Sequence, residues 1–232
     1  MEDPSKDVDY DESYYAPLVK RYTNKTRMEK YTIANVMRLA EIKPGSHVLE
    51  LGCGKGTFSI ECSKLGCTTV GVDRSPVAAK LAERMFRMYG KGKGRFLVSD
   101  CADIKIDEKK EKFDYILAIN LVEHIYNTVF IKMLKECKRL LNKDGKIVIY
   151  APSQSHYLEK IKKIGLNTHS GIGHISYKTL PYMVNELKKA GFVVDEAYYW
   201  GSHLPLLGTV DTMLSFLPLF RRRICIRAHL GM

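Results

Sequence analysis

Three glycines at alternate positions, Gly52, Gly54 and Gly56, follow the apolar run 47–51 and precede a helical pattern. Glycine lets the backbone turn sharply, and it lets a ligand approach without a Cβ in the way. The helix that follows offers free backbone N–H groups at its start. A strand, a glycine-rich turn and a helix in this order therefore predict a site for a nucleotide-type ligand.

Two aspartates follow the next two predicted strands. Asp73 ends the strand expected over 69–73, where a carboxylate is placed to accept hydrogen bonds from ribose hydroxyls. Asp100 follows the strand expected over 95–99 and adds a second carboxylate on the same rim of the sheet. Either aspartate could instead cap the helix that comes after it. The glycine turn and the two aspartates fall on successive strand ends in the right order, which favours a ligand site.

Two other nucleotide motifs fit the glycine turn less well. A dinucleotide fingerprint needs glycine or alanine at position 57, where this chain has Thr57. A phosphate-binding loop needs serine or threonine directly after Gly-Lys, but Lys55 is followed by Gly56. Both motifs are therefore disfavoured.

The elements that would position these residues alternate between strands and helices. This rhythm predicts an α/β fold whose mostly parallel sheet is covered by helices on both faces. The run 115–119 is nearly all apolar, as a doubly covered sheet requires. We expect strands at 47–51, 69–73, 95–99, 113–119, 146–151, 192–199 and 224–230, and helices at 26–41, 57–65, 76–89, 127–141 and 179–190.

The glycine turn resembles the first motif of the class I S-adenosylmethionine-dependent methyltransferases, in which an acid precedes three alternate glycines. Glu50, Gly52, Gly54 and Gly56 match that motif in full. The resemblance covers about residues 48–152 and extends more loosely to the C-terminus. It implies a Rossmann-like sheet of seven strands, with an antiparallel seventh strand beside the sixth, and S-adenosyl-L-methionine as cofactor.

The resemblance also implies roles for individual residues. The glycine loop would pass beneath the cofactor, and Asp73 would bind its ribose. Asp100 would contact the adenine amino group, with Cys101 supplying backbone, and Asn120 would lie near the methionine moiety and the methyl group. The residues implied for cofactor binding are Glu50, Gly52, Cys53, Gly54, Gly56, Asp73, Arg74, Asp100, Cys101 and Asn120.

The segment 120–124, Asn-Leu-Val-Glu-His, carries the first catalytic candidates. It resembles the Glu-x-x-Glu-His segment of methyltransferases for small and lipidic metabolites, such as those of ubiquinone biosynthesis. Asn120 replaces the first acid of that segment, so we expect no metal site. Glu123 or His124 is a candidate base or substrate contact, and a base is needed only if the acceptor atom carries a proton. Alternatively, both residues cap and orient the helix at 127–141.

Two insertions are expected on the acceptor side, at 152–178 and 201–220. The first contains Gly-His-Ile-Ser at 173–176, which resembles a common segment of the family. His174 is therefore the second base candidate, and its alternative role is to cap the following helix. Long connections of this kind are usually functional or have structure of their own.

The second insertion has an apolar helical stripe. Residues 204–220 contain no lysine or arginine, and three arginines follow at 221–223. The stripe could pack against the domain, line an apolar acceptor pocket or form a homodimer contact. It could also lie on an anionic membrane surface through Leu204–Arg223, with the arginines as anchors.

The charge of the chain is +11 and is unevenly distributed. Residues 1–12 carry −5 and the remainder carries +16. Such a basic chain could bind RNA, an anionic membrane or an acidic small molecule. Nucleic acid is disfavoured, because segment 120–124 lacks the Pro-Pro-Tyr clamp of base methyltransferases. Most of the basic residues are dispersed over predicted helices, as on a solvated surface.

The sequence predicts two regions. Residues 1–25 form an acidic, tyrosine-rich N-terminal arm or lid, and residues 26–232 form the methyltransferase domain. Six cysteines without paired spacing, and an acidic start unlike a signal peptide, indicate reduced thiols in the cytoplasm, with membrane association left open. The 45% hydrophobic composition excludes a wholly disordered chain.

The predicted reaction is methyl transfer from S-adenosylmethionine to a small apolar or lipid-like acceptor. Oxygen is the favoured nucleophile, because the Glu-His segment resembles that of O-methyltransferases. Two alternatives stay open: an RNA methyltransferase that uses the basic surface, and a catalytically inactive subunit that binds the cofactor and activates a partner.

Overall fold

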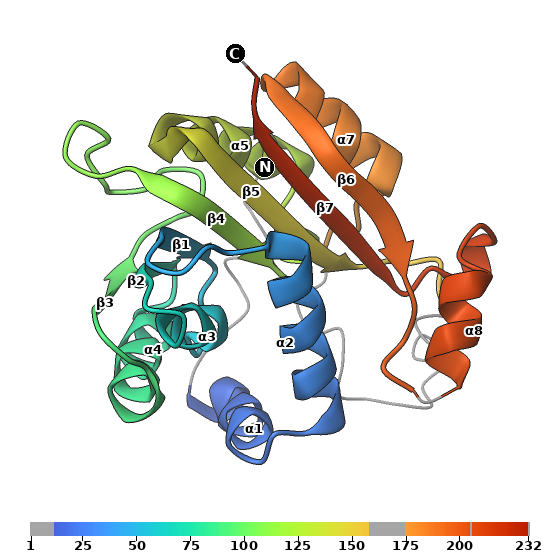
Figure 1. Cartoon of the computed structure of the whole chain (residues 1–232), viewed down its shortest axis with the longest axis horizontal. Coiled ribbons are helices and arrows are strands. Elements are labelled where there is room, and N and C mark those ends of the chain that lie inside the picture. Colours follow the sequence, from blue (N-terminus) through green and yellow to red (C-terminus); the bar gives the residue numbers. More distant parts are fainter. Residues whose placement is uncertain (1–11, 158–174, 205, 232) are drawn as a thin grey trace.

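Seven strands form one sheet in the computed structural model, which describes residues 12–157, 175–204 and 206–231. They are β1 (His47–Leu51), β2 (Thr68–Asp73), β3 (Gly94–Val98), β4 (Phe113–Ile119), β5 (Leu141–Pro152), β6 (Phe192–Trp200) and β7 (Arg223–Leu230). Their order in the sheet is β3-β2-β1-β4-β5-β7-β6 (Figure 1). Strands β1 to β5 pair in parallel, and β7 runs antiparallel between β5 and β6. The predicted fold class and the antiparallel seventh strand beside the sixth are confirmed.

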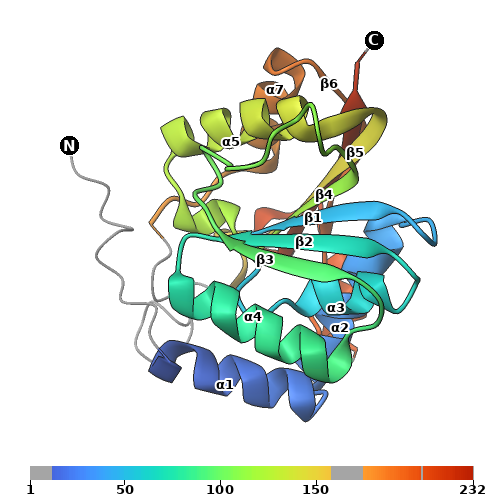
Figure 2. The same cartoon turned by 90° about the vertical axis from the view of Figure 1, so that its left-hand side faces the viewer.

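Helices cover both faces of the sheet (Figure 2). They are α1 (Glu12–Thr23), α2 (Arg27–Ala40), α3 (Thr57–Ser63), α4 (Pro76–Tyr89), α5 (Asn127–Leu140), α7 (Leu180–Lys189) and α8 (Leu207–Met213), with 3-10 turns η2 (Val122–His124) and η4 (Pro218–Phe220). Helices α5 and α7 lie on one face and α2, α3 and α4 on the other, with α1 outside them. No helix among the described residues is long and apolar enough to cross a membrane.

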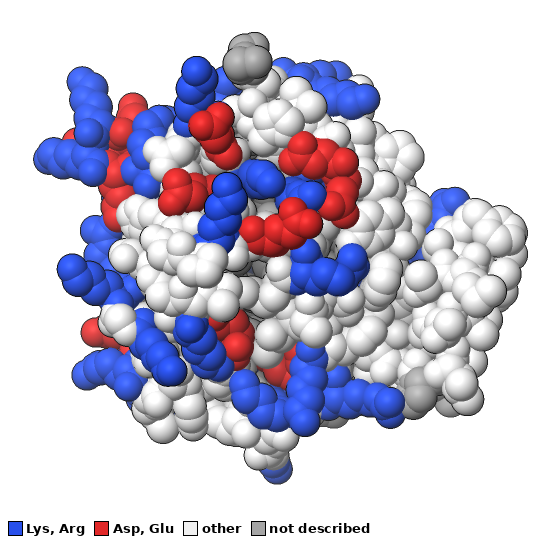
Figure 3. Space-filling model, in the orientation of Figure 1, with Lys and Arg blue, Asp and Glu red and all other residues white. Residues whose placement is uncertain are grey.

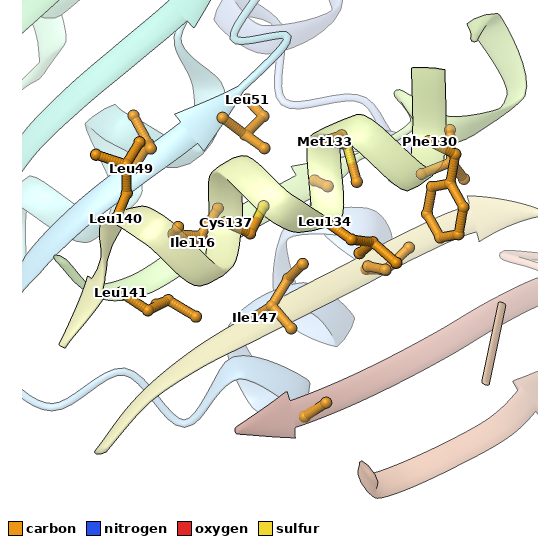
Figure 4. Close-up of a cluster of buried hydrophobic side chains, with 14 of the residues drawn as sticks. Leu49, Leu51, Ile116, Phe130, Met133, Leu134, Cys137, Leu140, Leu141 and Ile147 are labelled. Atoms are coloured by element: carbon orange, nitrogen blue, oxygen red, sulfur yellow. The ribbon is translucent and has the colours of Figure 1, made fainter. Parts of the chain in front are cut away.

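Helix α5 shows why the sheet needs an apolar cover. Its buried side chains recur at intervals of three or four, so they form one stripe that faces the sheet. Figure 4 shows this stripe above the inward-facing side chains of β1, β4 and β5. The stripe consists of Phe130, Met133, Leu134, Cys137 and Leu140, and the strands contribute Leu49, Leu51, Ile116 and Ile147.

Helix α1 lies within the segment predicted to be an arm or lid. Tyr15 and Tyr22 are 4% and 1% exposed, and the Tyr22 hydroxyl donates to Glu61 Oε1 of α3 at 3.0 Å. Tyr22 also packs in one cluster with Met85 of α4. No helix was expected for this segment from the sequence, and Pro17 inside α1 removes a backbone donor. Tertiary contacts of the tyrosines therefore stabilise a helix that local sequence disfavours.

Strand β5 begins earlier than the predicted start at residue 146. Leu141 pairs with Phe113 of β4, and the register shifts between Phe113 and Tyr115. The intervening residues 142–145, Asn-Lys-Asp-Gly, are typical of a turn, which is why a break was expected. Asn142 Nδ2 donates to Asp114 Oδ1 at 2.7 Å and holds this irregular start against β4.

The insertion that contains α8 presents its apolar side to solvent. Leu206, Met213 and Phe216 are 85%, 73% and 67% exposed. Asp211 is buried instead, where its Oδ2 accepts the Ser202 N–H at 3.1 Å and contacts His156 Nε2 at 3.1 Å. Of the alternatives for the apolar stripe, packing against the domain is not the one that the structure shows, because a buried polar cluster anchors the opposite face. In Figure 3 the lobe at the position of α8 is almost without charged side chains.

Candidate functional site

The glycine loop between β1 and α3 requires glycine for two reasons. Gly52, Gly54 and Gly56 have φ of 61°, 52° and 75°, in the left-handed region that favours glycine. A Cβ at Gly52 would lie 2.9 Å from Leu121 Cδ1, in the segment that follows β4. At Gly54 the nearest atom is Tyr15 Cε1 at 3.8 Å, so the loop is not packed tightly there. The loop thus lies against the segment after β4 at Gly52 and beside Tyr15 of α1 at Gly54.

Glu50 is hydrogen-bonded to the start of α3, the helix that follows the loop. Its Oε2 accepts the Ser59 N–H at 2.8 Å and the Ser59 hydroxyl at 2.6 Å, and its Oε1 accepts the Phe58 N–H at 3.3 Å. The carboxylate is buried at the start of α3, and burial raises its pKa to about 7 against the effect of these bonds. Both of its oxygens contact α3, so any effect of Glu50 on a ligand passes through the loop.

Asp73 joins the end of β2 to the loop. Its Oδ2 accepts the Gly54 N–H at 2.9 Å, and its Oδ1 accepts the Ser75 N–H at 2.9 Å. Each carboxylate oxygen has two lone pairs, so the side chain can still accept hydroxyl donors. Burial raises its pKa above the ordinary value. Asp73 is therefore oriented by the backbone and retains the capacity to bind a diol.

Tyr15 is a residue of this site that the sequence analysis did not single out. It is buried against the loop, and burial and the nearby Asp73 carboxylate both raise its pKa. The sequence signal was the tyrosine-rich composition of residues 10–31, which predicted a lid without indicating which tyrosine would lie on the site.

The end of β3 lies beside the end of β2. The Ser99 N–H donates to the Asp73 carbonyl at 2.9 Å, which holds the two strand ends together. Asp100 is exposed on this rim, and its Oδ1 accepts the Ala102 N–H at 2.8 Å. Cys101 and Arg74 are half-buried next to Asp100 and Asp73 in the chain.

Cys53 belongs to the interior of the loop. Its N–H donates to the Val72 carbonyl at 3.0 Å, its carbonyl accepts the Gly56 N–H at 2.7 Å, and its side chain is buried. Burial raises the pKa of its thiol well above the ordinary value. Cys53 therefore contributes backbone geometry to the loop and no thiolate.

Asn120 follows β4 on the same rim. It has a left-handed φ of 51°, and its N–H donates to the Tyr150 carbonyl of β5 at 2.7 Å. Its Oδ1 accepts a hydrogen bond from Nη1 of Arg223, the first residue of β7, at 3.1 Å. The structure thus brings the glycine loop, Asp73, Asp100 and Asn120 to one rim of the sheet.

The candidates Glu123 and His124 lie in the 3-10 turn η2. Glu123 is 2% exposed, and its carbonyl accepts the N–H groups of Ile175 and Ser176 at 3.1 and 3.2 Å. His124 is half-buried. Helix α5 begins after Tyr126, which makes no capping side-chain bond. Glu123 therefore supports the segment after the first insertion through its carbonyl, and its burial does not favour the role of an accessible base. These bonds go to the segment at Ile175 and not to α5, the helix that it was expected to cap and orient.

Lys178 binds the backbone carbonyls of this turn, and no sequence motif indicates it. Its Nζ donates to the carbonyls of Val122 and Ile125 at 2.8 and 2.6 Å. Burial lowers its pKa to about 8, and the nearby Glu123 carboxylate opposes that shift. The Lys178 Nζ also donates to the Ser176 carbonyl at 3.1 Å. No motif marks this lysine, because the two carbonyls of the turn that it binds are more than fifty residues away in the chain.

His174 lies outside the described residues, and so does most of the insertion at 152–178. Within the described ranges, no group of three or more histidine, cysteine or acidic side chains is arranged to hold a metal ion. All six cysteines carry free thiols.

The rim fits a nucleoside-containing cofactor. The loop has three left-handed glycines, and Asp73 is already aligned by the loop's own N–H group at Gly54. Asp100 follows β3, on one side of β2 and β1 in the sheet, and Asn120 follows β4, on the other side. A diol bound by Asp73 would therefore have Asp100 on one side and Asn120 on the other.

Comparison with known proteins agrees with this geometry. A family profile described as a methyltransferase domain matches residues 24–197. The ubiquinone biosynthesis O-methyltransferase of Coxiella burnetii (strain RSA 493 / Nine Mile phase I) is 30% identical over 127 residues, which cover 52% of each chain. The sterol 4-C-methyltransferase strm-1 of Caenorhabditis elegans is 25% identical over 138 residues, which cover 59% of this chain and 39% of the relative. The chain spans about half the length of the ubiquinone relative.

Solved structures share the fold. The magnesium protoporphyrin IX methyltransferase of Synechocystis PCC 6803, solved with bound SAH, superposes with a TM-score of 0.65 at 17% identity and covers 94% of this chain and 97% of that one. A TehB-like SAM-dependent methyltransferase from Corynebacterium glutamicum gives 0.63 at 18% identity over 95% and 100%. Because the family profile spans most of the sequence, the chain belongs to the methyltransferase domain family, with the fold of the class I S-adenosylmethionine-dependent enzymes.

Proposed function

We propose that this chain transfers a methyl group from S-adenosylmethionine to a small acceptor with an apolar or lipid-like body. The observation that carries the proposal is the hydrogen bond from the Gly54 N–H to Asp73 Oδ2 at 2.9 Å, which links Asp73 to the glycine loop. Both lie on the same rim of the sheet as Asn120. When bound, the cofactor supplies a methyl group already activated on a sulfonium. The protein has to position the two reactants and exclude water.

The residues on the rim divide this work. Asp73 would accept the ribose hydroxyls, and Asp100 the adenine amino group, with Cys101 supplying backbone. Arg74 follows Asp73 at the same edge, and Asn120 would lie near the methionine moiety. Glu50, Gly52, Cys53, Gly54 and Gly56 would shape the surface on which the cofactor rests.

A proton on the acceptor atom would need a base near Asn120. His124 and His174 are the proposed bases, since an imidazole titrates near neutral pH. Glu123 would act by holding His124 and the segment from Ile175 in place, because its carbonyl accepts the Ile175 N–H. Oxygen is the favoured nucleophile, and a relative named as an O-methyltransferase supports this choice.

We also propose that the apolar lobe of residues 206–219 lies on an anionic membrane surface. Its exposed apolar side chains lie on α8 and in the segment around it, and the Arg221 side chain donates to the carbonyls of Ser215 and Phe216 in the same lobe. Amphipathic helices of this kind bind lipid interfaces through buried apolar area together with basic charge. The exposed side chains of the lobe are Leu206, Leu207, Val210, Met213, Phe216, Leu217 and Leu219.

The three arginines that were expected to anchor this lobe as a group have different surroundings. Arg222 is buried, and Arg223 contacts Asn120. Arg221 lies against the lobe, and its guanidinium carbon is 4.5 Å from the ring centroid of Tyr199. Lipid binding would therefore depend on the apolar side chains more than on an arginine cluster.

The test of the reaction is transfer of a tritiated methyl group from S-adenosylmethionine into separated extract fractions of RNA, protein, lipid and small molecules. We expect incorporation into the lipid or small-molecule fraction. Incorporation into RNA alone would support the RNA alternative and reject the proposed acceptor class. Cofactor binding without transfer into any fraction would support the inactive partner subunit instead.

A further inference from the structure

Arg223 is the first residue of β7 and lies on the rim that carries the candidate site. Because β7 is antiparallel, its start lies beside the ends of β5 and β6, where Arg223 pairs with Pro152 and Trp200. From there its guanidinium reaches Asn120 Oδ1 at 3.1 Å. The guanidinium carbon also lies 5.4 Å from the ring centroid of Tyr150. The antiparallel course of β7 thus places the Arg223 guanidinium next to Asn120, the residue that follows β4.

This cation has no acidic partner among the described residues. No carboxylate oxygen lies within 4.0 Å of the Arg223 guanidinium in the parts of the chain that the structure describes, and its one hydrogen bond goes to a neutral amide. Arg227, four residues further along the same strand, contacts Glu41 and Glu196. A guanidinium has five N–H donors, so most of those on Arg223 remain available.

The surroundings of Arg223 offer further polar capacity. The Tyr150 hydroxyl is buried and has no hydrogen-bond partner within the described ranges. Burial raises the pKa of Tyr150, and the Arg223 charge opposes that rise, as expected for neighbouring groups. A guanidinium with free donors beside a neutral amide favours an oxygen-rich anionic ligand.

We propose that Arg223, together with Asn120, binds a carboxylate or phosphate group carried by the methyl acceptor. This inference rests on the proposed function and narrows its acceptor to an acidic amphiphile, whose anionic group lies near the atom that is methylated. Arginine suits this task because its planar fork can hold two anionic oxygens at once. The acceptor would thereby be fixed in orientation as well as attracted.

The sheet order favours the acceptor over the cofactor as the source of the anion. Strand β7 is four places from β2 in the sheet, about 19 Å at roughly 4.8 Å per strand. Asn120, which follows β4, lies between them, and Asp73 ends β2. Arg223 therefore approaches Asn120 from the side away from the proposed ribose contact, whereas a cofactor held at Asp73 reaches Asn120 from the other side.

Trp200 allows a direct binding assay. It is the one tryptophan of the chain, and it pairs with Arg223 across β6 and β7. Octanoate and octanamide are titrated against tryptophan fluorescence, with and without S-adenosylhomocysteine. They share an apolar tail and differ in charge, so their difference isolates the anionic group. We expect octanoate to bind at least about 10-fold more tightly, the factor of one charge-assisted hydrogen bond.

Arg223→Gln keeps an amide donor for Asn120 and removes the charge. It should abolish the preference for octanoate, and Arg223→Lys should retain part of it. Arg87→Gln is the matched control, because it removes the same charge at an exposed side chain of α4 that belongs to neither proposed binding surface. This control should bind octanoate as the parent does. Circular dichroism checks that each variant is folded.

Three results would overturn the proposal. The first is equal affinity of the parent for octanoate and octanamide, which does not depend on any variant folding. The second is an unchanged preference in folded Arg223→Gln. The third is a loss of S-adenosylhomocysteine affinity in Arg223→Gln with unchanged affinity for 5′-methylthioadenosine, because Arg223 would then bind the cofactor's own carboxylate. Failure of the parent to bind S-adenosylhomocysteine would instead reject the proposed function, and the octanoate comparison without cofactor would still decide on Arg223.

Discussion

The carboxylate of Asp73 accepts the backbone N–H of Gly54 at 2.9 Å, so the proposed ribose contact and the glycine loop form one hydrogen-bonded unit. Both oxygens of Asp73 are engaged in this way, because Oδ1 accepts the Ser75 N–H. A change at Asp73 should therefore alter the shape of the loop as well as the contact to the ligand.

Asp73→Asn should weaken S-adenosylhomocysteine binding at least about 10-fold and lower the free energy of unfolding by about 1–3 kcal/mol. An amide offers one acceptor oxygen where the Gly54 and Ser75 N–H groups need two, so one of them faces an NH2 group. Calorimetric titration and urea unfolding measure the two effects. Asp144→Asn, at an exposed position in β5, is the control. Unchanged binding in Asp73→Asn would refute its role at the ribose.

Gly52→Ala should destabilise the protein more than Gly45→Ala. Both glycines have positive φ, 61° and 80°, so both substitutions carry backbone strain of about 1–2 kcal/mol. Only at Gly52 would the new Cβ meet a neighbour, Leu121 Cδ1 at 2.9 Å, which adds about 1–3 kcal/mol of overpacking. Urea unfolding gives the difference between the variants. Equal losses would show that Leu121 moves aside at no cost.

Lys178 should make stability rise with pH above neutrality. Burial lowers its folded pKa to about 8 from 10.5, so between these values the unfolded chain binds more protons than the folded one. The free energy of unfolding of the parent, relative to Lys178→Met, should therefore increase by about 1 kcal/mol per pH unit from pH 8 to pH 10. Lys188→Met, at an exposed position on α7, controls for the loss of a charge. Parallel pH profiles for the parent and Lys178→Met would contradict this account.

The apolar lobe should bind lipid through its exposed side chains. The double variant Met213→Gln/Phe216→Gln should sediment less with vesicles of phosphatidylcholine and phosphatidylserine and keep the stability of the parent, because both side chains already lie in solvent, at 73% and 67% exposure. Met88→Gln, on α4 and 63% exposed, is the matched control. Equal sedimentation of parent and double variant would reject the membrane proposal. A dimer in size-exclusion chromatography that the double variant dissociates would assign the lobe to self-association.

Elements with local signals could be predicted from the sequence. The ranges expected for β4 and α4 match those observed, Phe113–Ile119 and Pro76–Tyr89. Helix α4 has a complete start signal, since Ser75 Oγ accepts the Ala78 N–H at 3.3 Å and Pro76 follows it. The glycine loop and the strand-end aspartates were predictable for the same reason, because their spacing along the chain sets their place on the rim.

Features that depend on distant partners could not be predicted. The amphipathic stripe of α8 indicated a helix but not which face would be buried, because that is decided by the contact of Asp211 with His156, 55 residues away. The contact of Arg223 with Asn120 joins residues 103 apart, so the arginine was interpreted with its neighbours in the chain. In both cases the sheet topology, and not the local sequence, selects the partner.

The antiparallel insertion of β7 between β5 and β6 also sets an order of assembly. Until β7 is in place, β6 has no strand to pair with and β5 keeps an open edge. The cofactor half, built on β1, β2 and β4, can form earlier, because its strands pair with one another through contacts closer in sequence. Pulse-labelled hydrogen exchange during refolding should show protection of β1 and β2 amides before those of β6 and β7. The fold would thus acquire its proposed cofactor site before its proposed acceptor site.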